Sequence, residues 1–415
     1  MSKKLRIGIY GFGVVGKGLY DIIHQNRYVD IEITKICVKD KDKKRSLPQG
    51  CFTFDQKEII QDSSIDVIVE LISEADEAYT IVSEALKLGK KVVTANKKMV
   101  AENLPELIEI QKEYGGTLLY EASCCGSIPV VRTFEDYLKN EPLRSIEGIF
   151  NGSSNYILSK IFNDGLSYDQ ALKEAQELGF AEADPTLDVG GFDAANKLCI
   201  LATHAFGVEI HPEEVVNFGI QNLSQFEVDL AKSKHQKIKS LALAFRNNED
   251  KIIPLVLPCF VEKDNTLFDV EYEYNAVKIN AEYADSQLLE GKGAGAYPTG
   301  AAVLSDIIAI QDNYTYEYKK LNHNSYVGLV EDISINVYIR FEKEDILKNL
   351  GIDVFEEIAI SGQERAIRGK VLLSKLLELK KAPVEDKILI AVEEKNFLED
   401  SVTSKRDDSK VAVAL

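Results

Sequence analysis

A glycine-rich turn near the start of the chain constrains the fold more than any other feature. Residues 4–10 form a β-rich run that leads into Gly11-Phe-Gly13-Val-Val-Gly16, and the apolar pattern of a helix follows. In such turns the first glycine permits the tight bend, the second lets the backbone approach a pyrophosphate, and the third lets helix and strand pack closely. The helix N-terminus then faces the phosphates. The sequence predicts a dinucleotide-binding turn whose cofactor contacts are Gly11, Phe12, Gly13, Val14, Val15 and Gly16.

Apolar runs and helical patterns alternate through residue 132. The expected strands cover 31–38, 65–72, 91–94 and 118–121, and a helix over 79–88 separates two of them. This alternation favours a doubly wound parallel sheet, and hence an α/β protein that begins with a Rossmann domain over residues 1–132. Ligands of such sheets bind at the carboxyl ends of the strands. The residues that follow the strands are therefore candidate cofactor contacts: Lys39, Ser73, Asn96 and Lys97.

The end of the second expected strand bears on the choice of cofactor. An acid at this position usually binds the ribose hydroxyls of NAD, whereas a basic residue suits the 2′-phosphate of NADP. Here Lys39 and Asp40 are adjacent, and the basic run 41–45 follows. We expect NADP(H) to be preferred, with NAD(H) as the alternative. Most of the lysines in this run are expected to lie in a solvated loop.

The rhythm of the chain changes after residue 140. A strand is expected over 145–150, a polar turn over 151–155 and a helix over 156–162, and strand-like runs follow at 252–261, 267–272 and 275–281. This pattern indicates a second, α+β domain. A second glycine-rich loop, 291–300, leads into an apolar helix over 301–310. Its Gly295 could bring backbone N–H groups to a phosphate or ribose, or the loop could be a hinge between domains.

Carboxylates are crowded in the stretch 179–198, GFAEADPTLDVGGFDAANKL. Asp193 and Lys197 are four residues apart at the start of an expected helix, so they share one face. Charges this dense need a ligand, a counter-ion or abundant water. One interpretation is an amino-acid substrate site, and the other is a solvated salt bridge on a surface loop.

Composition excludes several classes of function. The net charge of −18 argues against a nucleic-acid or anionic-membrane partner, and we find no apolar run of about 20 residues and no signal peptide. Six scattered cysteines fit a reducing cytoplasm, and the histidines form no zinc motif. The chain has no Walker A sequence, which argues against an NTPase.

Six sequence blocks in order resemble the homoserine dehydrogenase family over about residues 4–330. They are GFGVVGKG, TANK at 94–97, EAS with GSIPV within 121–130, NGSSNYIL at 151–158, the acidic stretch 179–198, and GKGAGAYPTG at 291–300. The resemblance implies an NAD(P)-dependent oxidoreductase acting on a CH–OH group. It would interconvert L-homoserine and L-aspartate 4-semialdehyde in the biosynthesis of threonine, methionine and isoleucine. Since only a few residues of the given sequence precede the first expected strand, we do not expect a fused aspartokinase.

The resemblance also implies roles for individual residues. Lys97 and Lys197 match the two active-site lysines, and Asp193 matches the acid that steadies Lys197. The residues expected to bind substrate, besides Lys197, are Gly152, Ser153, Glu182 and Asp188. A sodium-binding loop would involve Glu121, Cys124 and Gly126.

Elementary chemistry agrees with two lysines at one site. Reduction of an aldehyde needs a hydride donor and an acid near the carbonyl oxygen, and a lysine with a lowered pKa can be that acid. We prefer Lys97 as general acid/base and Lys197, kept charged by Asp193, as electrostatic partner; the reverse assignment stays open. We expect Asp184 to cap the turn before Pro185. Cys124 and Cys125 are either small buried side chains or oxidation-sensitive thiols beside the lysines.

The C-terminal part is the hardest to interpret. Many relatives end in an ACT regulatory domain, and 335–341, 343–350 and 387–393 could supply a strand, a helix and a last strand. The proline-glycine signature after the first strand is missing, so threonine feedback is not expected. We predict a Rossmann domain over 1–132 and about 300–330, a substrate-binding and dimerisation domain over 133–299, a reduced ACT-like domain over 331–397 and a mobile tail over 398–415. The family implies a homodimer or homotetramer.

Overall fold

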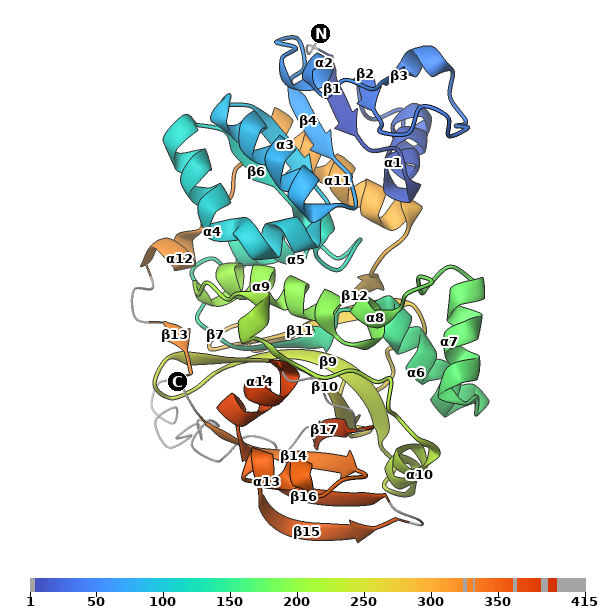
Figure 1. Ribbon diagram of the computed structural model, residues 1–415. Helices are drawn as coiled ribbons and strands as arrows, with labels where there is room; N and C mark the ends of the chain where they lie inside the picture. Colours follow the sequence, from blue (N-terminus) through green and yellow to red (C-terminus); the bar gives the residue numbers. More distant parts are fainter. Residues whose placement is uncertain (1–3, 324–326, 331–332, 361–363, 382–386, 394–415) are drawn as a thin grey trace, which may run out of the picture.

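The computed structural model describes residues 4–323, 327–330, 333–360, 364–381 and 387–393, which build two sheets with helices around and between them (Figure 1). The tail predicted to be mobile, 398–415, lies outside the described residues. Within these ranges no helix is both long and apolar enough to cross a membrane.

The first sheet is parallel and has the strand order β3-β2-β1-β4-β5-β6, as expected for a Rossmann domain. Its strands are β1 (Leu5–Tyr10), β2 (Ile31–Cys37), β3 (Phe52–Thr53), β4 (Val67–Glu70), β5 (Lys91–Thr94) and β6 (Thr117–Leu119). The strand expected over 118–121 therefore ends at Leu119, and Glu121 begins the 3₁₀ turn η2 (Glu121–Ser123). Because the strand order reverses between β1 and β4, a ligand-binding crevice is expected above these two strands.

Helices cover the faces of this sheet. They are α1 (Val14–Gln25), the short α2 (Lys57–Ile60), α3 (Ala75–Lys87), α4 (Lys97–Tyr114) and α11 (Ala296–Gln311). Helix α11, far along the chain, lies against α1 (Figure 1). The two helices approach so closely that a Cβ atom at Gly18 would lie 2.2 Å from the Ala296 carbonyl oxygen. The second glycine-rich loop, which leads into α11, is thereby held near the first.

The second sheet is mixed and much wider, with the order β12-β11-β7-β9-β10-β17-β14-β16-β15. Its strands are β7 (Leu143–Ile149), β9 (Lys237–Arg246), β10 (Lys251–Val261), β11 (Tyr274–Ala281), β12 (Ser286–Lys292), β14 (Ser334–Phe341), β15 (Asp353–Ala359), β16 (Arg365–Leu372) and β17 (Leu389–Glu393); β8 (Val216–Asn217) and β13 (Gly328–Leu329) also pair with β10. The strand expected over 267–272 is wrong. Those residues form turns, because Asn265 accepts from the backbone of Leu267 and Phe268 while Leu267 turns into the core.

The C-terminal elements follow the order β14, α13 (Asp345–Leu350), β15, β16, α14 (Leu373–Lys381), β17. This βαββαβ order is that of ferredoxin-like units. The unit is not separate from the rest of the molecule: β17 pairs in parallel with β10, where Cys259 lies opposite Val392. Whether the unit is ACT-like stays a prediction.

Helix α9 (Phe192–Phe206) lies between the two sheets (Figure 1). It packs on α4 on one side and on β7, β9 and β10 on the other. All of its residues except Phe192 and Asn196 are buried. Of the remaining helices, α8 (Thr186–Val189) packs on α9, α6 (Gly152–Asp164) on β9 and β11, α7 (Tyr168–Glu177) on α6, and α10 (Gln225–Ser233) on β9. The interpretation of Asp193 and Lys197 as a solvated surface pair is therefore wrong.

Candidate active site

The first glycine-rich turn has the geometry of a phosphate-binding loop. Gly11 has a φ of +92°, and a Cβ atom there would lie 2.5 Å from the Leu71 carbonyl oxygen. A Cβ at Gly16 would lie 2.8 Å from the Gly11 carbonyl oxygen, so this glycine lets α1 pack under the turn. A Cβ at Gly13 would meet no atom within 4 Å, so space remains above the N-terminus of α1 for a phosphate.

A cleft of about 880 Å³ opens above this turn, within the size range of cofactor sites. Its wall includes Gly11, Phe12, Gly13, Val14, Val15, Lys39, Ser73, Lys97 and Glu182. Three residues expected to contact the cofactor, Gly16, Asn96 and Gly295, are not among the described residues that form this wall. Asn96 is buried and caps α4, and Gly295 caps α11.

Basic and acidic groups mix where β2 ends. Lys43 and Arg45 lie on the cleft wall with Lys39, which was the only residue of this basic stretch expected from the sequence to contact the cofactor. Lys39 also lies 3.4 Å from the carboxylate of Glu77. Asp40 lies on the same wall. The cleft can therefore offer cations to a phosphate and a carboxylate to ribose hydroxyls.

Two lysines from different elements converge on Asp193. The Lys97 ammonium, on the first residue of α4, lies 2.5 Å from one carboxylate oxygen of Asp193. Lys197, one turn further along α9, donates to the other oxygen at 2.8 Å and to the Phe150 carbonyl at 2.6 Å. The side chain of Lys97 is 43% exposed, whereas the side chains of Asp193 and Lys197 are almost completely buried. The cleft therefore reaches Lys97 directly.

Asp193 decides the charge state of the buried lysine. Burial is the largest single influence and would lower the pKa of Lys197, but the Asp193 carboxylate, with smaller contributions from Cys125 and Cys124, outweighs it and the pKa is raised. Burial would likewise raise the pKa of Asp193, yet the ammonium groups of Lys197 and Lys97 hold that pKa well below its usual range. Lys197 is therefore an ammonium and Asp193 a carboxylate at neutral pH.

A second acid, Asp188, lies next to this group. The side-chain amide of Asn151 donates to Asp188 at 2.8 Å and to Asp193 at 2.9 Å. Burial raises the pKa of Asp188, although the hydrogen bond from Asn151 opposes the shift. Asn151 also accepts from the backbone N–H of Ser154 and thus caps α6. Its importance was not foreseen: the sequence signal was the polar turn before a helix, a common N-cap position.

The other residues expected to bind substrate are placed less closely together. Gly152 begins α6, and a Cβ there would lie 2.8 Å from the Glu273 carbonyl oxygen. The Ser153 hydroxyl donates to the Phe180 carbonyl at 2.5 Å, so it already has an acceptor. Glu182 is exposed and lines the same cleft as Lys97. Asp184 accepts from the backbone and hydroxyl of Thr186, which is the turn-capping role expected for it.

The loop after β6 is tightly constrained. Both carboxylate oxygens of Glu121 accept backbone N–H groups, from Val131 at 2.9 Å and Arg132 at 2.8 Å. A cation here would depend mainly on backbone carbonyls. Cys125 and Gly126 both have positive φ, 54° and 58°, so the backbone bends sharply. The described residues contain no cluster of three His, Cys, Asp or Glu side chains suited to a metal.

The two cysteines of this loop are fully buried. Burial raises the pKa of the Cys124 thiol well above its usual range and that of Cys125 to about 12. The neighbouring Lys197 lowers both values, but burial dominates. Because thiolates rather than thiols are reactive, the structure favours inert packing over oxidation sensitivity.

A buried carboxyl below the cleft also escaped the sequence analysis. Glu70, the last residue of β4, is completely buried, and burial raises its pKa to about 7. The apolar run around it suggested only a core strand.

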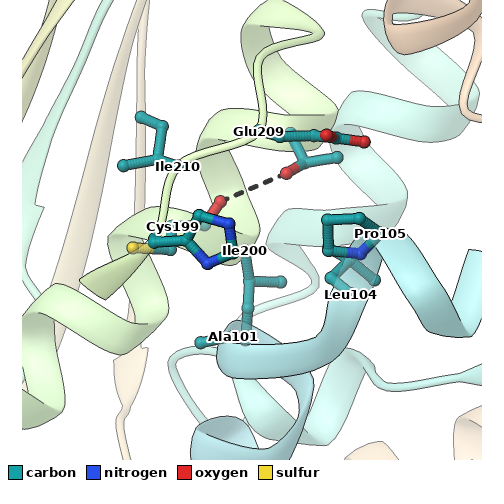
Figure 2. A pocket seen from close by; sticks show the side chains of 9 residues that line it. Ala101, Leu104, Pro105, Cys199, Ile200, Glu209 and Ile210 are labelled. Atoms are coloured by element: carbon teal, nitrogen blue, oxygen red, sulfur yellow. Dashed lines mark hydrogen bonds between the residues drawn. The ribbon is translucent and has the colours of Figure 1, made fainter. Parts of the chain in front are cut away.

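A small hollow between α4 and α9 is no ligand site (Figure 2). Its volume is about 10 Å³, room for one water molecule at most.

Comparison with known proteins gives consistent matches. Residues 129–308 match the family model described as homoserine dehydrogenase, and residues 11–121 match the one described as its NAD binding domain. The chain is 36% identical to homoserine dehydrogenase of Bacillus subtilis over 335 residues, which are 79% of this chain and 76% of that protein. It is 37% identical to homoserine dehydrogenase of Helicobacter pylori, covering 75% of this chain and 74% of that protein.

Solved structures are similar along most of the chain. A homoserine dehydrogenase from Thiobacillus denitrificans aligns with a TM-score of 0.75 and 27% identity, covering 94% of this chain and 98% of that one. A hyperthermophilic archaeal homoserine dehydrogenase, solved in complex with NADPH, aligns with a TM-score of 0.63 and 26% identity, covering 76% of this chain and 99% of that one.

Proposed function

The chain belongs to the homoserine dehydrogenase family, oxidoreductases that act on a CH–OH donor with an NAD-binding domain. From this premise we propose that the reaction takes place where the glycine-rich cleft meets Lys97, Asp193 and Lys197. The observation that carries the proposal is the shared carboxylate of Asp193, which holds two ammonium groups beside the cleft. When bound, the nicotinamide supplies or accepts the hydride.

The two lysines divide the remaining work. Two of the three N–H groups of the Lys197 ammonium donate to Asp193 and Phe150, so the third can donate to the substrate oxygen. Its raised pKa keeps it charged, which suits polarising that oxygen rather than giving up a proton. Lys97 faces the cleft and has one close acid, so we assign it the proton transfer. A positioned acid/base of this kind contributes about 10²–10⁴-fold.

The acids explain the selectivity for an amino-acid substrate. No described lysine forms an ion pair with Asp188 or Glu182. Asp188 lies beside Asp193 through the shared Asn151 amide, and Glu182 lines the cleft together with Lys97. Their carboxylates suit the ammonium group of L-homoserine. Gly152 and Ser153 would approach the substrate through the start of α6. A simple hydroxy acid lacks the ammonium group and would be repelled.

We propose NADP(H) as the preferred cofactor and NAD(H) as a usable alternative. The cleft fits a dinucleotide, because Gly13 leaves open space at the helix N-terminus. Lys39, Lys43 and Arg45 offer charge to a 2′-phosphate. The archaeal relative crystallised with NADPH supports the same choice. Asn96 and Gly295 do not line the cleft. They would act on the cofactor indirectly, by holding the starts of α4 and α11 in place.

We also propose a sodium ion at the loop of Glu121, Cys124 and Gly126. Cys125 and Gly126 bend the backbone so that carbonyl groups can converge. The buried amide of Asn275 finds no nitrogen or oxygen partner among the described residues and has the Cys125 thiol beside it. Hard cations bind oxygen ligands such as side-chain amide and backbone carbonyl oxygens. The ion would order the loop beneath Lys197.

The larger organisation is also proposed rather than observed. We infer a homodimer or homotetramer in the cytoplasm, with the cofactor held by residues 1–132 and about 300–330, substrate and subunit contacts by 133–299, and a reduced ACT-like unit over 331–397. The family and the two-sheet architecture support this division.

The decisive experiment measures initial rates of L-aspartate 4-semialdehyde reduction with NADPH and with NADH. Lys97→Ala should lower kcat by about 10²-fold or more, whereas Lys98→Ala, a neighbour paired with Glu102, should change it little. If Lys97→Ala keeps its kcat while Lys197→Met loses it, the two lysines must exchange roles. Absence of turnover by the wild type with either cofactor would contradict the proposed reaction.

A further inference from the structure

Glu70 occupies an unusual place for a carboxyl group. It ends β4 at the carboxyl edge of the first sheet and has no exposed surface. One carboxyl oxygen accepts the backbone N–H of Ile72 at 2.5 Å. The other accepts the hydroxyl of Thr94, the last residue of β5, at 2.5 Å. Burying an acid is costly unless hydrogen bonds compensate, and both carboxyl oxygens of Glu70 have such partners.

The contacts continue until they close on themselves. The Thr94 oxygen that donates to Glu70 also accepts the backbone N–H of Asn96 at 3.0 Å. The side-chain amide of Asn96 donates to the Ile72 carbonyl at 3.0 Å. Four hydrogen bonds thus join Glu70, Thr94, Asn96 and Ile72 in a ring, here named the strand-end ring.

The strand-end ring connects the two loops that matter most to the proposed reaction. Ile72 and Ser73 form part of the cleft wall after β4. Asn96 caps α4 by accepting from the backbone of Met99, and the next residue, Lys97, is the first of that helix. A shift in the ring would move the cofactor wall and the Lys97 ammonium together.

We propose that Glu70 and Thr94 are positioning residues, which fix Lys97 and the loop at residues 71–73 in one relative geometry through the strand-end ring. This inference rests on the proposed function, because it assigns the ring a role in setting up Lys97 and the cofactor. Neither residue touches substrate. Their effect is geometric, and a displacement of about 1 Å at a reacting group can cost about 10²-fold in rate.

Thr94→Val tests the ring with little change of shape, since it removes only the hydroxyl that both donates and accepts. We expect kcat to fall by about 10-fold or more and the NADPH dissociation constant to rise several-fold, by the misplacement argument. Thr94→Ser keeps the hydroxyl and should restore both. Thr117→Val, at the far end of β6 in the same sheet, is the matched control and should leave both unchanged.

A double-mutant cycle separates positioning from a merely structural role. If Thr94 acts through Lys97, Thr94→Val should lower kcat much less in a Lys97→Ala background than in the wild type. Equal losses in both backgrounds would overturn the inference, as would a Thr94→Val protein that melts earlier yet keeps its kcat and NADPH affinity. Should Thr94→Val fail to fold, Glu70→Gln, which puts a donor where the Thr94 hydroxyl needs an acceptor, takes its place in the same cycle.

The proposed function can fail without the ring failing. If the wild type reduces no L-aspartate 4-semialdehyde, NADPH binding measured by fluorescence still compares Thr94→Val with Thr94→Ser. Weaker binding only in the valine variant would support the ring. Equal binding in both variants would overturn its link to the cofactor wall.

Discussion

The side-chain amide of Asn151 donates to half-buried Asp188 and to buried Asp193, and so ties the start of α6 to both acids of the site. Asn151→Asp would place a third carboxylate against these two. We expect kcat/KM for L-homoserine to fall by about 10²-fold, because like charges displace the acids that orient the lysine and the substrate. Steady-state kinetics at neutral pH measures the effect.

A control for this change exists on α4. The Asn103 side chain donates to the Met99 carbonyl within its own helix, so Asn103→Asp adds the same charge away from the acids and should leave kcat/KM nearly unchanged. Similar losses in the two variants would show that added charge, rather than the link from Asn151, causes the effect.

Asp193 should make stability depend on acid pH. Its pKa is held well below the usual range by two ammonium groups against the opposing effect of burial. A carboxyl with a lowered folded pKa stabilises the protein above its unfolded pKa of about 3.9, and this contribution is lost as pH falls through the folded value. Asp193→Asn should cost about 3–5 kcal/mol at neutral pH, since it leaves buried Lys197 uncompensated.

The pH dependence of that difference is the sharper measurement. Urea unfolding of wild type and Asp193→Asn should show a gap in the free energy of unfolding that is full at pH 6 and smaller at pH 3. A gap of the same size at both pH values would mean that the ionised carboxylate does not stabilise the fold.

The basic groups at the end of β2 should discriminate between cofactors. Arg45→Ala and Lys43→Ala remove charge from the cleft wall, so each should raise the KM for NADPH by about 10-fold while changing the KM for NADH by less than about 2-fold, in keeping with a charge-assisted bond worth about 1.5–3 kcal/mol. Lys35→Ala, whose partner is Glu58 outside the cleft, serves as the control. An equal effect on both cofactors would argue against contact with a 2′-phosphate.

Cys124 and Cys125 should resist oxidation in the folded protein. Their burial raises both thiol pKa values, so peroxide or iodoacetamide at neutral pH should leave activity intact. Cys51, which is partly exposed, should be modified first, as mass spectrometry of the digested protein would reveal. Loss of activity in step with modification of Cys125 would restore the hypothesis of an oxidation-sensitive site.

Local patterns predicted what depends on local geometry. The glycine-rich turn, the parallel strands and the placement of Asp193 and Lys197 on one helical face follow from spacing of a few residues. Asn151 could not be predicted, since its acceptors lie 37 and 42 residues further along the chain. The role of Glu70 could not be predicted either. The sequence shows an acid at the end of an apolar strand, but not the partner Thr94, which lies 24 residues further along the chain.

Long-range pairing explains the remaining differences. The C-terminal strands were expected as a unit of their own, yet β17 pairs with β10 through residues far apart in sequence. The run 267–272 looked like a strand because apolar residues recur in it. Two of them, Leu267 and Val270, are indeed buried. A turn buries them as well as a strand would, and only the fold distinguishes the two.

The chain divides the ion pair between its two halves. Lys97 stands on α4, a helix of the first sheet, whereas Asp193 stands on α9, which packs on α4 and on the second sheet. Any motion that separated α4 from α9 would also separate these charges. The contact between these two helices is therefore part of what assembles the site, because Lys97 meets Asp193 only where α4 and α9 touch.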